Sequence, residues 1–284
     1  MCCFGGLERA TSLRRAAERC YPAAALVWIV LSWSNVASAA EIRVPNDQPT
    51  IQGAIDAAST CDIIVVYPAT YPESIQLRGK TITLRSTDPT SPSVVARTII
   101  QGQGSSVVTF AGTESASCVL SGFTITGGQS NVGAGIRGHG THATIRYNVI
   151  TGNSASDLPS AGGGGLYDCD GLIEYNTIAR NSVSTASDYY SGSVSGGGLS
   201  GCGGTIRHNA ITSNSIGTPG DGWAFGGGLH DCNGTVEDNL ISGNYAYGGA
   251  TGTGSSLSDC HGTIQRNIIS RNTMICGDGY PWGG

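Results

Sequence analysis

The stretch Asn148-Val-Ile-Thr-Gly-Asn153 decides the fold, because the chain repeats it four more times. The later copies are Asn176-Thr-Ile-Ala-Arg-Asn181, Asn209-Ala-Ile-Thr-Ser-Asn214, Asn239-Leu-Ile-Ser-Gly-Asn244 and Asn267-Ile-Ile-Ser-Arg-Asn272. Successive copies start 28, 33, 30 and 28 residues apart. A period of this length indicates a repeat architecture, in which each unit buries its apolar face against its neighbours.

Each copy also carries apolar residues at fixed places before the Asn phrase. One lies three residues ahead of it, and the five members are Ile145, Ile173, Ile206, Val236 and Ile264. A leucine that follows a run of small residues lies seven residues earlier in four copies, at Leu166, Leu199, Leu229 and Leu257. Helical repeats need helix formers, which are sparse here, and leucine-rich repeats need several leucines per copy. Three short strands per coil fit better, so the sequence predicts an all-β, right-handed, single-stranded parallel β-helix.

Polar and small residues of the repeat are expected to form columns along the β-helix. Asparagine tolerates the left-handed backbone of a sharp bend, and its amide can bond the equivalent amide about 4.8 Å away on the next coil. The repeat cysteines are expected to be buried at a bend, with disulfides between neighbouring coils as the alternative, and they are Cys169, Cys202, Cys232 and Cys260. A straight column does not surround a zinc ion. An exposed ion-pair ladder is expected at Arg146, Glu174, Arg207, Glu237 and Gln265.

The first forty residues are predicted to be a signal peptide. Arginines 14, 15 and 19 precede an apolar run over 23–31, and Ser38-Ala39-Ala40 supplies the small residues that a signal peptidase needs. A membrane anchor is the alternative, but the run is short and serines dilute the segment after it, so no stable span is expected in the mature chain. The sequence therefore predicts a secreted, periplasmic or cell-surface protein. With 12% charged residues and a net charge of -5, a nucleic-acid surface is not expected.

The mature chain is expected to divide into an N-terminal cap over residues 41–80 and β-helix coils over residues 81–284. Residues 50–58 predict a short amphipathic helix with Thr50 as its N-cap, and this helix would cover the first coil. Residues 277–284 parallel residues 220–227, where a coil begins. The sequence therefore predicts a fragment that stops inside a coil, which the genomic DNA beyond Gly284 would test.

From about Ile42 onward the chain resembles the pectin-lyase-like superfamily of right-handed β-helix proteins. The resemblance lies in the helix-cap phrase, Pro68-Ala-Thr-Tyr-Pro-Glu73, Gly122-Phe-Thr-Ile-Thr-Gly-Gly128 and the Asn phrases. Tyr71-Pro-Glu73 is similar to pectinesterases and Gly138-His139-Gly140 to polygalacturonases, but the other catalytic residues of both families have no match. The calcium-binding aspartates and the base of pectate lyases cannot be assigned either. The resemblance implies the fold, and the catalytic residues stay unknown.

A candidate sugar-binding surface is expected where variable insertions follow the second Asn of each copy. These insertions carry aromatic residues, which suit sugar stacking, namely Tyr189, Tyr190, Trp223, Phe225, Tyr245 and Tyr247. The adjoining strands add polar residues, and the substrate-binding candidates are Tyr167, Asp168, Tyr190, Trp223, His230, Asp231 and Asp259. Asp231 and Asp259 would be neighbours on adjacent coils, where two carboxylates can bind calcium. Alternatively these aspartates cap the bend.

The sequence therefore predicts an exported, monomeric β-helix protein whose partner is a polysaccharide or glycan. It would bind or process that polymer along a groove between the leucine strands and the variable loops. If the protein is an enzyme, it is expected to be a polysaccharide lyase or a glycoside hydrolase. The alternative is a non-catalytic module at the cell surface.

Overall fold

The computed structural model describes residues 39–156, 160–185, 192–218, 222–248, 251–277 and 281–282. All but the last two residues of the predicted signal peptide, residues 1–40, lie outside these ranges. The chain divides into two units, Met1–Ala39 and Ala40–Gly284, and the architecture below is that of the second. Within the described ranges, no helix is long and apolar enough to cross a lipid bilayer.

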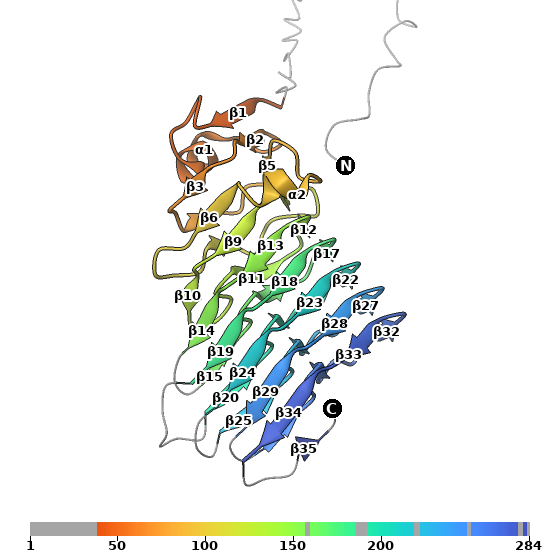
Figure 1. Cartoon of the computed structure of the whole chain (residues 1–284). Coiled ribbons are helices and arrows are strands. Elements are labelled where there is room, and N and C mark those ends of the chain that lie inside the picture. The colour runs from red at the N-terminus through yellow and green to blue at the C-terminus, as the bar shows by residue number, and fades with distance from the viewer. Residues whose placement is uncertain are drawn as a thin grey trace, which may run out of the picture. The chain divides into compact units, whose positions relative to one another are not determined.

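The second unit is a parallel β-helix, as the sequence predicts (Figure 1). Its strands form five sheets, named A to E here, and each strand pairs in parallel with strands of the adjacent coils. Sheet A holds the Thr-Ile strands, namely β1 (Glu41–Val44), β2 (Ile63–Val66), β5 (Thr83–Ser86), β8 (Val119–Ser121), β12 (Thr144–Arg146), β17 (Leu172–Glu174), β22 (Thr205–Arg207), β27 (Thr235–Glu237) and β32 (Thr263–Gln265).

Sheets B and C complete the main tube. Sheet B holds the Asn phrases, namely β3 (Thr70–Tyr71), β6 (Ile99–Gln101), β9 (Thr124–Thr126), β13 (Val149–Thr151), β18 (Thr177–Ala179), β23 (Ala210–Thr212), β28 (Leu240–Ser242) and β33 (Ile268–Ser270). Sheet C holds the leucine strands, namely β4 (Ile75–Gln76), β7 (Val108–Thr109), β11 (Ile136–Thr141), β16 (Leu166–Cys169), β21 (Leu199–Ser200), β26 (Leu229–His230) and β31 (Leu257–Ser258). Stacked Ile and Leu side chains of these three sheets form one buried core.

The prediction of three strands per coil is wrong, because the segment after the second Asn forms two more strands. Sheet D consists of β10 (Gln129–Ser130), β14 (Ser154–Ser156), β19 (Ser182–Ser184), β24 (Ser215–Gly217), β29 (Tyr245–Gly248) and β34 (Thr273–Cys276). Sheet E consists of β15 (Ser160–Gly162), β20 (Ser193–Ser195), β25 (Trp223–Phe225), β30 (Thr251–Thr253) and β35 (Pro281–Trp282). In most of these strands the buried central residue is small or medium-sized and apolar, and its two neighbours lie on the other face of the strand, as expected of a strand with one buried face.

Sheets D and E pack against each other around a second, smaller core. Its side chains are the central residues of the strands, together with Ala134, and they are Ala155, Ala161, Val183, Val194, Ile216, Ala224 and Ala246. Most of them are small, so the two sheets can pack closely against each other. The flanking residues of each strand therefore point outward, from sheet D on one side and from sheet E on the other.

Helix α1 (Ile51–Ala57) covers the first coil, as predicted. Thr50 Oγ1 accepts a hydrogen bond from Gly53 N–H at 3.0 Å, which confirms the expected N-cap. The carboxylate of Glu73 accepts from the N–H groups of Ile51 and Gln52, both at 2.9 Å. Lys80 Nζ donates to carbonyls in the last turn, including that of Ile55 at 2.7 Å. Glu73 therefore has a structural role at the positive end of the helix dipole. The other helix, α2 (Pro92–Val95), lies in the connection between β5 and β6.

Both predicted asparagine ladders are present and buried. Asn176 Nδ2 donates to Asn209 Oδ1 at 3.1 Å and to the Ile145 carbonyl at 2.9 Å, and the same pattern recurs along the column. The second ladder repeats it through Asn181 and Asn214. Each amide thus satisfies backbone and side-chain groups of the neighbouring coils, which lets the chain turn sharply inside its own core.

The four cysteines of the column are free thiols, so the alternative of disulfides between neighbouring coils is wrong. Cys169, Cys202 and Cys232 are fully buried, and Cys260 is half-buried. The amide of Cys232 donates to Cys260 Sγ at 3.4 Å, so the side chains follow each other along the axis. This arrangement confirms the expected column of small buried residues.

Candidate functional site

The outer faces of sheets E and C meet at an inner corner, where side chains five residues apart in the chain touch. Ser195 Oγ lies 3.2 Å from Ser200 Oγ on one coil. On the next coil the ring of Phe225 lies 5.6 Å from that of His230, and on the following coil Thr253 Oγ1 lies 2.6 Å from Ser258 Oγ. We call this surface the E/C corner. It lies where the sequence predicts a groove between the leucine strands and the variable segments, and the groove itself stays a prediction.

A glycine makes the sharp turn from sheet E into sheet C on each coil. Gly226 has a φ of 66°, a conformation that favours glycine, and a Cβ there would overlap the carbonyl group of Leu229. Equivalent glycines precede each leucine strand, which explains the run of small residues in every repeat. The turn directs Phe225 at the end of β25 toward His230 in β26.

Trp223 is the most exposed aromatic side chain of the E/C corner. It lies at the start of β25, is 52% exposed and packs edge-on against Phe225 with the ring centroids 6.3 Å apart. Tyr167 lies in β16 on the same outer face of sheet C, where it pairs with Ser200. The candidates Tyr167 and His230 therefore lie on the outer face of sheet C, and Trp223 lies in sheet E beside Phe225. Tyr190, and with it Tyr189, lies outside the described residues.

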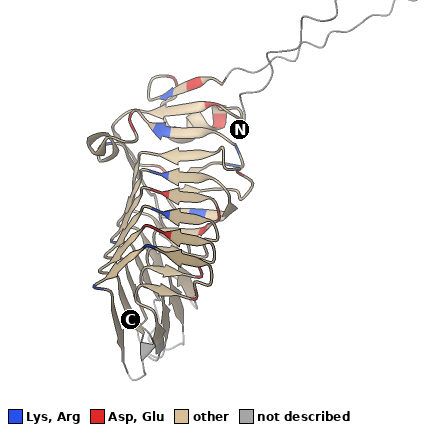
Figure 2. Cartoon of the chain, turned by 90° about the vertical axis from the view of Figure 1, so that its right-hand side faces the viewer, with Lys and Arg blue, Asp and Glu red and all other residues tan. Residues whose placement is uncertain are grey.

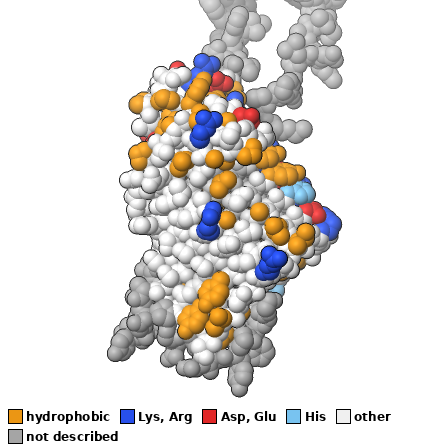
Figure 3. All heavy atoms as spheres, viewed as in Figure 1, with side chains coloured by type: hydrophobic (Ala, Val, Ile, Leu, Met, Phe, Trp, Pro, Cys, Tyr) orange, Lys and Arg blue, Asp and Glu red, His pale blue; other side chains and the backbone are white. Residues whose placement is uncertain are grey.

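The expectation that all aromatics of the variable segments share one surface is wrong. Tyr245 and Tyr247 lie in β29 of sheet D, where Ala246 between them points into the small core. Because sheets D and E enclose that core, their outer faces point in opposite directions, and the two tyrosines lie on the side away from Trp223. Figure 3 shows the side that carries sheets B and D, with small groups of hydrophobic side chains separated by polar surface.

The three candidate aspartates lie in the bend from sheet C to sheet A. Asp168, Asp231 and Asp259 have φ values of 56°, 51° and 54°, and the equivalent glycines Gly140 and Gly201 are left-handed as well, as is His139 beside Gly140. Aspartate and glycine tolerate this conformation, so the backbone accounts for their recurrence. It also accounts for the Gly-His-Gly phrase around His139, which forms the same bend one coil earlier.

Asp231 and Asp259 lie on successive coils but turn to different partners. Asp231 N–H donates to the Ser258 carbonyl at 3.0 Å, which places the two bends side by side. The Asp231 carboxylate accepts from Asn233 Nδ2 at 2.5 Å, and that of Asp259 accepts from Ser258 Oγ at 3.0 Å. In the described part of the chain, no three acidic, histidine or cysteine side chains gather as metal ligands would. Calcium binding by this pair stays a prediction.

His230 connects Ser200 and Asp259 across three coils. Its Nδ1 lies 3.5 Å from Ser200 Oγ and its Nε2 lies 3.4 Å from Asp259 Oδ2. A nucleophile and its base normally lie within about 2.6–3.2 Å, and the whole of Ser200 is only 3% exposed. The arrangement therefore suits a polar ladder better than acyl transfer.

Burial lowers the pKa of His230, and the nearby Asp259 carboxylate offsets part of this effect. Burial also raises the pKa of Asp168, with Asp170 adding to the rise.

Acidification is expected to destabilise the fold through His230. The pKa of His230 is lower in the folded chain than the ordinary value of about 6.5. As the pH falls, the imidazole is therefore protonated in the unfolded chain before it is protonated in the folded one. The free energy of unfolding should therefore fall as the pH drops below about 6.5, until the folded-state pKa is passed. Urea unfolding from pH 7.5 to 5 should show a smaller loss for His230→Gln than for the wild type. The control His261→Gln, at an exposed bend, should keep the wild-type slope, and equal slopes for His230→Gln and wild type would contradict this assignment.

A second aromatic column, which the sequence reasoning overlooked, lies at the corner between sheets A and B. Tyr147 and Tyr175 stack with centroids 5.2 Å apart, and Tyr175 stacks on His208 at 5.0 Å. They occupy the position just before the first Asn of each phrase, which could have identified them. Because each ring covers the face of the next, the column presents ring edges to solvent, so it is a poor platform for sugar stacking.

Comparison of the chain with models of known protein families, with curated proteins and with solved structures finds no match.

Proposed function

We propose that this chain binds polysaccharide along the E/C corner, with Trp223 as the principal contact. The single observation that carries the proposal is an exposed tryptophan that packs edge-on against Phe225, whose ring in turn lies beside that of His230. Sugar rings offer apolar faces that pack on aromatic rings, and hydroxyls that exchange hydrogen bonds with serine, threonine and aspartate.

The repeat adds a second argument for a polymer. Equivalent positions recur at about 4.8 Å along the axis of stacked strands, and the corner presents Ser195, Phe225 and Thr253 at one such position on successive coils. Of the equivalent positions on sheet C, only His230 is partly exposed, because Ser200 and Ser258 are buried. A chain of repeating units that runs along the axis would meet similar groups on each coil.

The proposal extends to the setting of the protein. The signal-peptide pattern of residues 1–40 supports export to the cell surface or beyond, where polysaccharides are accessible. The parallel β-helix and the phrases of residues 68–73 and 122–128 support membership in the pectin-lyase-like superfamily. We take the exported chain to act as a monomer.

Trp223→Ala is expected to weaken polysaccharide binding about five- to twelve-fold, because a lost aromatic contact of roughly 1–1.5 kcal/mol corresponds to that change. The matched control is Tyr245→Ala, which removes another exposed aromatic ring from the opposite, sheet D side. Calorimetric titration with a panel of neutral and uronic-acid polysaccharides, with and without calcium, measures both. Equal losses in the two variants, or none in Trp223→Ala, would refute the corner as the binding site.

Catalysis is the second candidate, and the adjacent Asp231 and Asp259 favour it, because glycoside hydrolases use two carboxylates that flank the scissile bond. Chain cleavage on the same panel, followed by product size or by unsaturated ends, separates the two functions. Binding without cleavage would support a non-catalytic module. Cleavage that is lost in both Asp231→Ala and Asp259→Ala would support the enzyme, and cleavage that survives both would exclude this pair.

A further inference from the structure

The outer face of sheet A carries one continuous column of side chains, one from each strand. In register order the column is Arg43, Val65, Arg85, Ser121, Arg146, Glu174, Arg207, Glu237 and Gln265. Figure 2 looks onto this sheet, where the charged positions alternate in its later strands. The sequence predicts an ion-pair ladder here, and the structure shows that the ladder covers only part of the column.

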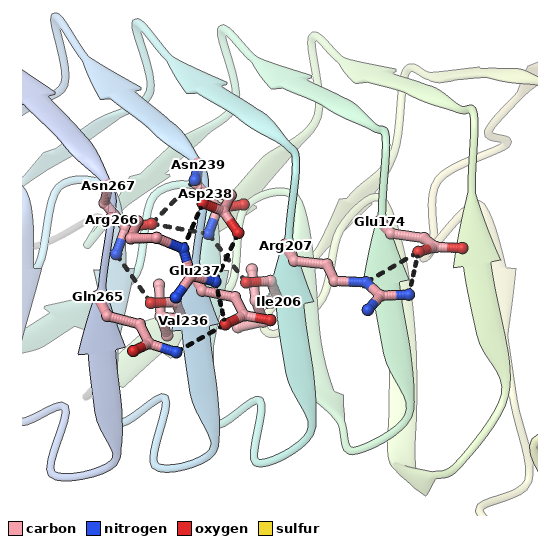
Figure 4. A network of polar contacts seen from close by, with 10 residues as sticks. All are labelled: Glu174, Ile206, Arg207, Val236, Glu237, Asp238, Asn239, Gln265, Arg266 and Asn267. Carbon is pink, nitrogen blue, oxygen red and sulfur yellow. Dashed lines mark hydrogen bonds and ion pairs between the residues drawn. The ribbon is translucent and has the colours of Figure 1, made fainter.

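The later strands satisfy their charges within the column and at the adjacent corner (Figure 4). Arg207 donates two hydrogen bonds to Glu174 Oε2, at 3.0 and 2.9 Å. Glu237 accepts from Gln265 at 2.8 Å and from Arg266 at 2.7 Å, and Arg266 also binds Asp238. Each carboxylate in this half therefore has a partner on the next coil.

The earlier strands leave two arginines without a carboxylate partner in the described residues. Arg85 Nη1 donates only to backbone carbonyls, those of Ser86 at 3.1 Å and Thr87 at 3.4 Å. The guanidinium of Arg146 lies 5.8 Å from the centroid of the Tyr147 ring, and its Nε is buried without a hydrogen-bond partner. Both arginines thus keep donors free at the end of sheet A next to sheet B.

Ser121 lies between these arginines, one strand from each. It is 2% exposed and its Oγ is buried without a partner. A buried polar group without a partner costs stability unless something binds it. The unpartnered hydroxyl and the unpartnered Arg146 Nε therefore belong to register neighbours on adjacent strands, with Arg85 on the other side of Ser121.

Nearby carboxylates do not neutralise this place. Glu174 turns to Arg207, and Glu41 binds Arg43 at 2.9 Å. Asp88, in the loop after β5, accepts from Thr90 inside its own turn. Glu114 is buried and accepts from the backbone of Gly79 at 2.9 Å. The chain as a whole has a net charge of -5, so its surface is not generally basic. The two arginines without carboxylate partners are therefore a local positive feature.

We infer that Arg85, Ser121 and Arg146 form a binding site for an oxyanion: a carboxylate, sulfate or phosphate group. Strands two apart are separated by roughly 9.6 Å, a gap that two arginine side chains can close from opposite sides. The planar guanidinium presents paired donors to such oxygens, and the Ser121 hydroxyl would donate from below. The site lies on sheet A and does not rest on the polysaccharide proposal for the E/C corner.

Thermal unfolding and calorimetric titration of the full chain with sodium sulfate test this site, with sodium chloride at equal ionic strength as the reference. Sulfate should raise the midpoint of unfolding beyond chloride. Arg146→Gln should weaken sulfate binding about ten-fold or more, since hydrogen bonds to charged groups are the stronger ones. Ser121→Ala should weaken it several-fold while leaving both arginines in place. The matched control Arg43→Gln removes a paired arginine from the same column and should bind sulfate as the wild type does.

A second arm identifies the source of the anion. The same variants are titrated with a sulfated or uronic-acid oligosaccharide and with its neutral counterpart. Binding of inorganic sulfate as tight as that of the oligosaccharide indicates a free oxyanion, and much tighter Arg146-dependent binding of the acidic oligosaccharide indicates an acidic glycan. The inference is overturned if neither anion binds better than chloride, or if Arg43→Gln and Arg146→Gln behave alike. If Arg146→Gln does not fold even without added anion, sulfate binding by Ser121→Ala is the test. Binding as tight as that of the wild type would then overturn the inference.

Discussion

Asn181→Ala is expected to lower the free energy of unfolding by roughly 2–6 kcal/mol, because it leaves buried polar groups without partners at about 1–3 kcal/mol each. Asn181 Oδ1 accepts from the backbone N–H of Asn153 at 3.2 Å and from its side chain at 2.9 Å. Its Nδ2 donates to the Ile150 carbonyl at 2.9 Å and to Asn214 at 3.1 Å. The residue is fully buried, so water does not replace these bonds.

Urea unfolding monitored by circular dichroism measures this effect. Asn131→Ala is the control, because Asn131 is exposed and its side chain bonds only to its sequence neighbours. That variant should change the free energy of unfolding by less than about 0.5 kcal/mol. A loss for Asn181→Ala as small as that of the control would show that the ladder contributes little to stability.

Gly234→Ala is expected to cost at least about 3 kcal/mol or to prevent folding, since overpacking that displaces backbone exceeds the usual penalty of about 1–3 kcal/mol. The coils approach so closely at this bend that a Cβ on Gly234 would overlap the carbonyl groups of Gly203 and Gly204 in the previous coil. The equivalent Gly171, Gly204 and Gly262 show the same overlap. The neighbouring backbone would have to move, and each carbonyl there belongs to a stacked coil.

Gly217→Ala is the matched control for that substitution. A Cβ at Gly217 would meet only Tyr247 Cβ, at 4.0 Å, which is an ordinary contact. Soluble yield and the midpoint of thermal unfolding should therefore stay near wild type for Gly217→Ala and fall steeply for Gly234→Ala. Similar midpoints for the two variants would contradict the close stacking of coils at the cysteine bend.

The main tube could be predicted from the sequence because its rules are local and repeat. The Asn phrase, the apolar residue three positions earlier and the leucine seven positions before that each map onto one sheet, and equivalent residues stack in register. The capping helix was predictable for the same reason, from Thr50 and one apolar face.

Sheets D and E could not be predicted with the same ease, because their strands lack large apolar residues. Ala155, Val183 and Ala224 are buried only because two strands of each coil enclose them, and serine-rich sequences resemble loops when read alone. This error also placed Tyr245 and Tyr247 on the same side as Trp223. The inner corner itself depends on left-handed glycines such as Gly226, whose run was visible but whose direction of turn was not.

The unpartnered arginines of sheet A show a further limit of sequence reasoning. Alternating charges predict pairing between neighbours, but pairing depends on which neighbour each side chain turns to. Glu174 accepts hydrogen bonds from Arg207 on one side, so Arg146 on the other side has no carboxylate partner. Only side-chain geometry separates the satisfied half of the column from the unsatisfied one.

The most direct test of polysaccharide binding at the E/C corner is the fluorescence of Trp223 in a variant where it is the only tryptophan, with Trp28, Trp33 and Trp282 replaced by phenylalanine. The exposed indole reports on its own contact with the ligand. Titration with the polysaccharide panel should give a saturable change in emission, together with protection from acrylamide quenching. A polysaccharide that co-sediments with the chain but leaves both the emission and the quenching of Trp223 unchanged would contradict the proposed site, and failure of every polysaccharide to bind would contradict the proposed function.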